Sequence, residues 1–196
     1  MEKIKIVYID DSPDTNLDEY FDKNYQNAVY EYSLVFFNPT AGYESLLEDI
    51  QIQTANIIFI DSRLFENQTT TGEKFSGEEF KLVLKKFYPF IEVIVITQNE
   101  VPENISMIAK YDPDPDKTPL DYYGSIIPPC IERATNSIKQ YQTLAIKLNE
   151  NTSWEVILKE KVMATLNGTN IYDELTKTDI DTLVAAFKEI QVNLDA

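Results

Sequence analysis

The sequence predicts an α/β fold for residues 1–148, a doubly wound (βα)5 parallel sheet with helices on both faces. Five short apolar runs divide the first 110 residues, and segments of helical period lie between them. Most of the runs are continuous Ile, Val and Phe rather than alternating, as expected for strands buried on both faces. Strands that alternate with helices are typical of parallel sheets with right-handed crossovers.

The five apolar runs are the expected strands. In chain order they are Ile4–Ile9, Tyr32–Phe37, Ile57–Ile60, Val93–Ile96 and Ser106–Ala109.

Apolar residues at helical spacing predict helices between these strands. The first helix follows Ser12-Pro13-Asp14, where a proline near the first turn is a start signal. The expected buried stripes are Leu17, Tyr20, Phe21 and Tyr25 in the first helix, Tyr43, Leu46, Leu47 and Ile50 in the second, and Phe80, Val83, Leu84 and Phe87 in the third. The fourth helix has only Gln98–Ile105 available, including Pro102, so we expect barely two turns there.

A long helix is expected from about Asp121 to Leu148. The Pro128-Pro129 pair should kink this helix or delay its start, because proline lacks an amide hydrogen and clashes with the preceding turn.

Residues 149–196 are expected to form a small helical extension. A first amphipathic stripe includes Trp154 and ends at Gly168, and a capping box of Thr178 and Asp181 precedes a second stripe. Fewer than fifty residues cannot bury two apolar stripes alone. The extension should therefore pack on the first domain, on a second copy of the chain or on a protein partner.

The composition excludes several classes of function. The chain has 17 Lys and Arg against 33 Asp and Glu, a formal net charge of −16, and no histidine. It therefore has no Ser-His-Asp triad, Cys-His pair or histidine-bound zinc. Its charge repels nucleic-acid phosphates and anionic lipids, so we expect neither nucleic acid nor membrane as a partner. The 5 glycines show no dinucleotide or P-loop spacing.

Two further features concern the core and the location of the protein. Cys130 is the only cysteine, and we interpret it as a core residue. No apolar run approaches the ~18 residues of a membrane-spanning helix, and the N-terminus shows no signal-peptide pattern. We therefore expect a cytoplasmic protein.

Polar residues stand where the expected strands end. The first strand ends in Asp10-Asp11, the third in Asp61, the fourth in Thr97 and the fifth in Lys110. In an open α/β sheet the functional crevice lies beyond these ends. Three carboxylates that converge there repel one another unless a divalent cation such as Mg²⁺ neutralises them. A lysine and a hydroxyl beside that ion are suited to binding a phosphoryl group.

Four segments resemble the receiver domain of two-component response regulators. They are Tyr-Ile-Asp-Asp-Ser at 8–12, Ile-Ile-Phe-Ile-Asp at 57–61, Val-Ile-Val-Ile-Thr at 93–97 and the strand that ends in Lys110. The resemblance covers about residues 3–148 and implies a flavodoxin-like sheet. It further implies Asp61 as the phosphoacceptor, with Asp10, Asp11, Asp61 and the backbone carbonyl of Arg63 as Mg²⁺ ligands. Thr97 would be the switch hydroxyl, and Lys110 would pair with the acceptor or its phosphate. An upstream kinase or phosphodonor and a downstream effector protein are the implied partners.

The sequence departs from the receiver pattern in three places. A longer segment, Phe65–Ser76, delays the glycine that follows the acceptor until Gly77. Tyr111 replaces the proline after Lys110, which puts the cis peptide bond of the family in doubt, and Met107 replaces the aromatic switch residue. Lys117 is a rival for the site lysine because its spacing from Thr97 is closer to that of the family. No apolar strand precedes Lys117, which favours Lys110.

Each site residue also has a simpler interpretation. Asp10 or Asp11 could cap the first helix, Asp61 could be a turn acid, Thr97 could be an ordinary strand end, and Lys110 could lie on an exposed edge. These four unrelated explanations would all have to apply to residues that stand at strand ends. A single functional site at those ends explains them together and is favoured.

Three classes of function remain at this point. We expect a phosphorylatable signalling switch rather than an enzyme. The first alternative is a receiver-like scaffold that binds partners without phosphorylation. The second is a Mg²⁺-dependent phosphohydrolase of the haloacid dehalogenase type. It is least favoured, because that chemistry places its nucleophile and acid two residues apart, whereas Asp10 and Asp11 are adjacent.

Overall fold

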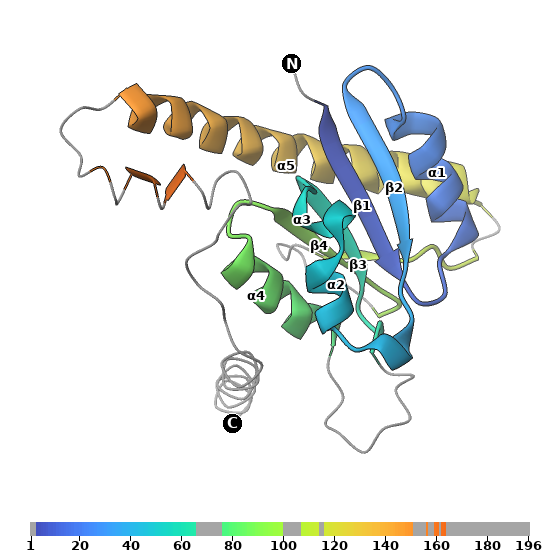
Figure 1. The fold of residues 1–196 in the computed structure, drawn as a ribbon. Helices are drawn as coiled ribbons and strands as arrows, with labels where there is room; N and C mark the ends of the chain where they lie inside the picture. Colours follow the sequence, from blue (N-terminus) through green and yellow to red (C-terminus); the bar gives the residue numbers. More distant parts are fainter. Residues whose placement is uncertain are drawn as a thin grey trace, which may run out of the picture.

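The protein forms a five-stranded sheet in which every neighbouring pair of strands is parallel (Figure 1). The computed structural model describes residues 3–65, 76–99, 107–113 and 116–150, with residues 156, 159, 160, 162 and 163. The strands are β1 (Ile4–Asp10), β2 (Tyr30–Phe36), β3 (Ile57–Asp61), β4 (Glu92–Thr97) and β5 (Met107–Ala109). Their order in the sheet is β2-β1-β3-β4-β5. The prediction of an α/β fold with a parallel sheet is confirmed.

Helices cover both faces of this sheet (Figure 1). They are α1 (Thr15–Tyr25), α2 (Glu44–Glu48), α3 (Ile50–Gln53), α4 (Gly77–Phe87) and α5 (Pro119–Glu150), and a 3₁₀ turn spans Pro39–Ala41. Helices α1 and α5 pack on one face, and α2, α3 and α4 pack on the other. Alternate residues of a strand point to opposite faces. Ile6 and Tyr8 of β1 therefore join the first core, and Val7 and Ile9 join the second.

Helix α1 is capped by Asp14, whereas the sequence also offered Asp10 and Asp11 as caps. The Asp14 side chain accepts hydrogen bonds from the amides of Asn16 and Leu17, at 2.8 and 3.4 Å. Such a cap satisfies amides that have no partner in the first helical turn. Asp10 and Asp11 therefore do not cap this helix, and the simpler interpretation of these two residues is wrong.

The second predicted helix is divided into two short ones, α2 and α3. Asp49 has an extended backbone, with φ −72° and ψ 123°, and its side chain accepts a hydrogen bond from the Gln51 amide. This local cap restarts the helix and shifts its buried face. Ile50, expected in the apolar stripe, is 66% exposed, whereas Ile52 is fully buried.

Helix α5 runs through Pro128 and Pro129 without a delayed start, contrary to one of the two expected outcomes. Its own start follows the capping rule, because Pro119 is the first helical residue and the Thr118 hydroxyl accepts from the Asp121 amide. Each internal proline leaves the carbonyl four residues earlier without its helical donor. Those earlier residues, Gly124 and Ser125, are exposed, so water can bind both carbonyls.

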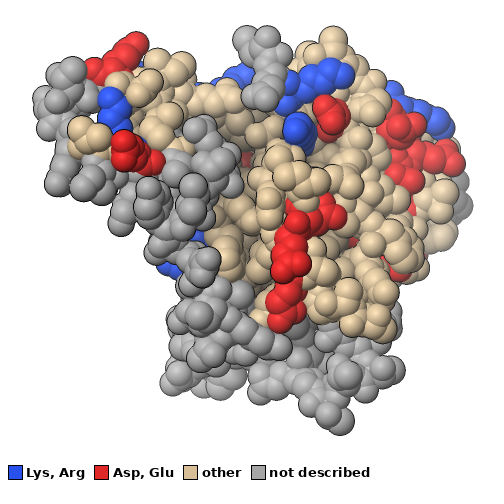
Figure 2. Space-filling view, viewed as in Figure 1, with Lys and Arg blue, Asp and Glu red and all other residues tan. Residues whose placement is uncertain are grey.

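The structure also shows the surroundings of Cys130 and the distribution of charge on one face of the molecule. Cys130 is buried in α5, as predicted. Acidic side chains are spread over several parts of the face seen in Figure 2, and basic side chains are gathered mainly near its upper edge. Among the described residues, no helix is long and apolar enough to span a membrane. Most of the predicted fourth helix, and the extension at 149–196 apart from α5's end and a few positions, lie outside the described residues.

Candidate functional site

The carboxyl ends of β1, β3 and β5 bring three predicted site residues to the same side of the sheet. Ile57 and Phe59 of β3 and Ile108 of β5 pack in the core beneath α1 and α5, as does Tyr8 of β1. Counting in steps of two along each strand places Asp10, Asp61 and Lys110 on this same face. Parallel strands in register therefore align one acid from each of two strands beside a lysine from a third.

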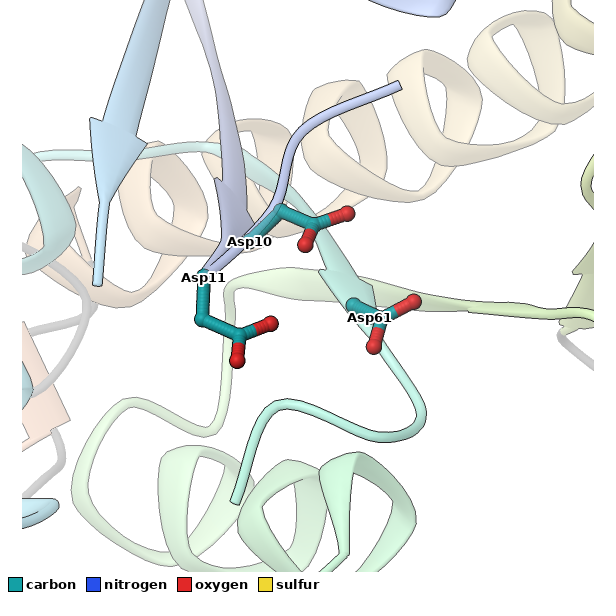
Figure 3. Close-up of side chains that lie close together, drawn as sticks. All are labelled: Asp10, Asp11 and Asp61. Carbon is teal, nitrogen blue, oxygen red and sulfur yellow. The ribbon is translucent and has the colours of Figure 1, made fainter. Parts of the chain in front are cut away.

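Three carboxylates gather at these strand ends (Figure 3). Asp10, Asp11 and Asp61 each offer an oxygen atom, and the three oxygens lie within 4.8 Å of one another. Asp10 is 1% exposed and Asp61 is 4% exposed, whereas Asp11 is half-buried. The cluster therefore has two buried members and one that reaches the surface.

Lys110 lies between the two buried carboxylates. Its Nζ atom is 2.7 Å from Asp61 Oδ1 and 3.0 Å from Asp10 Oδ2. Only 13% of its side chain is exposed, so the interpretation of Lys110 as an exposed edge residue is wrong. The rival Lys117 is exposed, and its backbone carbonyl accepts a hydrogen bond from the Tyr111 hydroxyl. The geometry thus brings Lys110 to the predicted acceptor.

Burial and charge act in opposite directions on this pair. Burial raises the pKa of Asp61, the charge of Asp10 raises it further, and the hydrogen bond from Lys110 opposes this without cancelling it. Burial alone lowers the pKa of Lys110, but its hydrogen bond to Asp61 and the charges of Asp61 and Asp10 prevail, so the pKa is raised. The two carboxylates therefore hold Lys110 as an ammonium ion.

Backbone amides fix the other oxygens of the two buried carboxylates. The Ser12 amide donates to Asp10 Oδ1 and the Arg63 amide donates to Asp61 Oδ2, each at 2.8 Å. The Arg63 side chain reaches Gln98 Oε1 at 3.1 Å, from the loop after β3 to the loop after β4. Each buried carboxylate is thus held by a backbone amide of its own loop on one oxygen and by Lys110 on the other.

Gly77 is required by its position against the backbone of Asp61. Its amide donates to the Ser62 carbonyl at 2.9 Å, and an added Cβ would lie 2.2 Å from the Asp61 carbonyl oxygen. Gly77 therefore lies against the end of β3, although most of the residues between Asp61 and Gly77 lie outside the described part of the chain.

We expect Gly77→Ala to destabilise the fold by about 1–3 kcal/mol, the usual cost of forcing an extra group into a packed site. Urea unfolding would measure the loss. Gly124→Ala is the matched control, because nothing lies within 4 Å of an added Cβ at that helical position. Alanine there should stabilise the fold by about 0.5–1 kcal/mol. Equal effects of the two substitutions would contradict the assigned contact.

Thr97 is buried at the end of β4 but falls on the other face of the sheet. Val93 and Val95 pack in the core beneath α2, α3 and α4, and Thr97 follows them in steps of two. Its hydroxyl accepts a hydrogen bond from the Asn99 amide at 3.1 Å. Met107, in the position of the aromatic switch residue, packs against the same core. No peptide bond among the described residues is cis, including the one after Lys110.

No family model and no curated protein matches this chain. What the site can hold must therefore follow from its own chemistry. The site gathers three carboxyl groups around one ammonium, and all the offered ligand atoms are oxygens. Hard divalent cations with oxygen ligands, Mg²⁺ above all, fit this donor set. Asp10, Asp11 and Asp61 would hold the ion, and Arg63 lies next to this set in the loop after β3.

One member of the site was missed by sequence reasoning. The Tyr8 hydroxyl donates to Asp10 Oδ2 at 2.5 Å and is fully buried. Burial, the charge of Asp10 and this hydrogen bond all raise the pKa of Tyr8, so its hydroxyl keeps its proton. The signal was present in the sequence, because a tyrosine two residues before an aspartate on a strand shares its face.

Proposed function

We propose that this chain is a signalling receiver that accepts a phosphoryl group on Asp61 in the presence of Mg²⁺. The observation that carries the proposal is the position of Lys110, whose ammonium contacts the Asp61 and Asp10 carboxylates at the strand ends. The sheet order, with helices on both faces, supports a flavodoxin-like, doubly wound receiver over residues 1–148.

The reaction needs a nucleophile and local positive charge. An Asp61 carboxylate oxygen would attack the phosphorus of a small donor such as acetyl phosphate. A new bond from phosphorus to that oxygen forms as the bond to the acetate oxygen breaks, and acetate leaves with the electron pair. A bound Mg²⁺ ion would supply charge that stabilises the phosphoryl oxygens.

The chain's own groups would orient these events. The Arg63 amide holds Asp61 Oδ2 at 2.8 Å, which leaves the carboxylate in one orientation. Lys110 bridges Asp61 and Asp10 before the reaction and can bind a phosphoryl oxygen after it, because the ammonium has three donors. We propose Thr97 as the hydroxyl that follows the phosphoryl group because of its place at the end of β4, although strand alternation puts it on the other face of the sheet from Asp61.

The consequence of phosphorylation would be a changed protein–protein interaction. We propose an upstream kinase or small phosphodonor, and a downstream effector that binds the receiver surface and the extension at 149–196. This extension carries 4 basic and 8 acidic residues over 151–196. Such a segment does not suit a nucleic-acid reader.

A beryllofluoride mimic tests the proposal without a covalent step. Fluorine NMR of the full chain should show a bound resonance when beryllofluoride and Mg²⁺ are both present. The signal should vanish in Asp61→Asn, which cannot offer the carboxylate. Asp22→Asn, an exposed position on α1, is the matched control and should keep the signal. A folded protein with no bound resonance would favour the scaffold that binds partners without phosphorylation.

A further inference from the structure

A hydrogen-bonded path of tyrosine and aspartate side chains leads away from the acidic site. Tyr8 donates to Asp10 Oδ2 at 2.5 Å, the oxygen that Lys110 also contacts at 3.0 Å. The Tyr8 hydroxyl in turn accepts from the Asp14 amide at 3.2 Å. The same hydroxyl therefore joins a carboxylate of the site to the residue that caps α1.

The path continues from Asp14 to the backbone beside Lys110. The Tyr123 hydroxyl donates to Asp14 Oδ2 at 2.5 Å and accepts from the Tyr111 amide at 3.0 Å. Next to it on α5, the Tyr122 hydroxyl donates to the Ala109 carbonyl at 3.0 Å. Consecutive tyrosines of α5 thus hold the residues immediately before and after Lys110.

The two tyrosines of the path and the Asp10 carboxylate are buried. Tyr8 and Tyr123 are both 0% exposed, and Asp10 is 1% exposed. Hydrogen bonds in such surroundings are strengthened by the low local dielectric, and a buried group that loses its partner is costly. The carboxylate of Asp10 and the backbone that carries Lys110 are therefore held in fixed positions relative to one another.

Packing alone does not explain these hydroxyls. The Tyr8 ring lies 6.2 Å from the Phe21 ring in an aromatic cluster, and phenylalanine would fill that space equally well. What phenylalanine lacks is the donor to Asp10 and the acceptor for the Asp14 amide. The hydroxyl is therefore specific to the acidic site, whereas the ring serves the core.

We propose that Tyr8 and Tyr123 are positioning residues for the acidic site. Tyr8 fixes the Asp10 carboxylate, and Tyr123 fixes both Asp14, which anchors Tyr8, and the backbone after Lys110. This inference rests on the proposed function, because the group positioned is the one that would hold Mg²⁺. Partners of metal ligands typically change affinity by about 10–100-fold when they are removed.

The test is calorimetry of Mg²⁺ alone with the full chain. Tyr8→Phe should weaken Mg²⁺ binding by about 10–100-fold, and Tyr123→Phe should weaken it in the same direction by a smaller factor. The matched control is Tyr32→Phe. The Tyr32 hydroxyl donates a hydrogen bond of 2.7 Å to Asp18, which is not part of the acidic site. Tyr32→Phe should bind Mg²⁺ as the unchanged protein does, although it too loses a carboxylate hydrogen bond.

The outcomes separate this inference from the proposed function. If the tyrosines were only structural, Tyr8→Phe and Tyr32→Phe would both lower the melting temperature and leave Mg²⁺ affinity unchanged, which would overturn the inference alone. Tighter binding by Tyr8→Phe would overturn it as well. If Tyr8→Phe does not fold, Tyr123→Phe must carry the loss of affinity. No Mg²⁺ binding by the unchanged protein would overturn both the inference and the proposed function.

Discussion

Lys110→Ala should lower the free energy of unfolding by about 3–5 kcal/mol, the cost of removing one member of a buried ion pair. The Asp10 and Asp61 carboxylates share the Lys110 ammonium, at 3.0 and 2.7 Å, and both are almost fully buried. Without it they would face each other with only backbone amides and the Tyr8 hydroxyl as partners. Urea unfolding at neutral pH and low salt would measure the loss.

Lys117→Ala is the matched control for this prediction. Lys117 is an exposed lysine in the same connection between β5 and α5, so its removal should change stability by less than about 0.5 kcal/mol. Adding Mg²⁺ should recover part of the stability of Lys110→Ala, because a cation bound to the folded state offsets the repulsion. A larger loss from Lys117→Ala than from Lys110→Ala would contradict the assignment of the site lysine.

The strands of the sheet could be predicted because each one is a short, continuous apolar run in the sequence. The runs Ile57–Ile60 and Val93–Ile96 are apolar throughout, and only strands buried on both faces need such runs at this length. Since the strands are parallel and in register, their last residues meet at one edge. This geometry is why Asp10, Asp61 and Lys110 could be grouped without any knowledge of their contacts.

The start and end of each helix could not be predicted, because several nearby side chains can cap the same helix. Asp49 caps α3 and so breaks a stripe that would otherwise continue from Leu46 to Ile50. Three acids precede α1, and any of them could cap it, but only Asp14 meets its first amides. Pro128 and Pro129 are tolerated because they lie on the exposed face of α5, a fact that depends on how the helix packs.

The site was only partly visible in the sequence for a similar reason. Tyr8 belongs to the apolar run Ile4–Ile9 and is buried, but the partner of its hydroxyl depends on where Asp10 and Asp14 lie. Tyr123 and Asp14 are 109 positions apart in the chain, so no local pattern joins them. Thr97 was grouped by its place at a strand end, whereas strand alternation puts it on the opposite face from Asp61.

Asp61→Asn should abolish phosphoryl uptake altogether. The amide has no anionic oxygen to attack phosphorus, and the nearest other carboxylate on that face, Asp10, already accepts from Tyr8, Lys110 and the Ser12 amide. Chelation of divalent ions should have the same effect in the unchanged protein, because three carboxylates at the site repel an anionic donor. Asp22→Asn should react as the unchanged protein does.

Intact-mass spectrometry after incubation with acetyl phosphate and Mg²⁺ tests the central claim most directly. We predict that the full chain gains the mass of one phosphoryl group, that the gain disappears in Asp61→Asn and on chelation, and that peptide mapping places it on Asp61. A folded chain that gains no mass, or an equal gain in Asp61→Asn, would contradict the account.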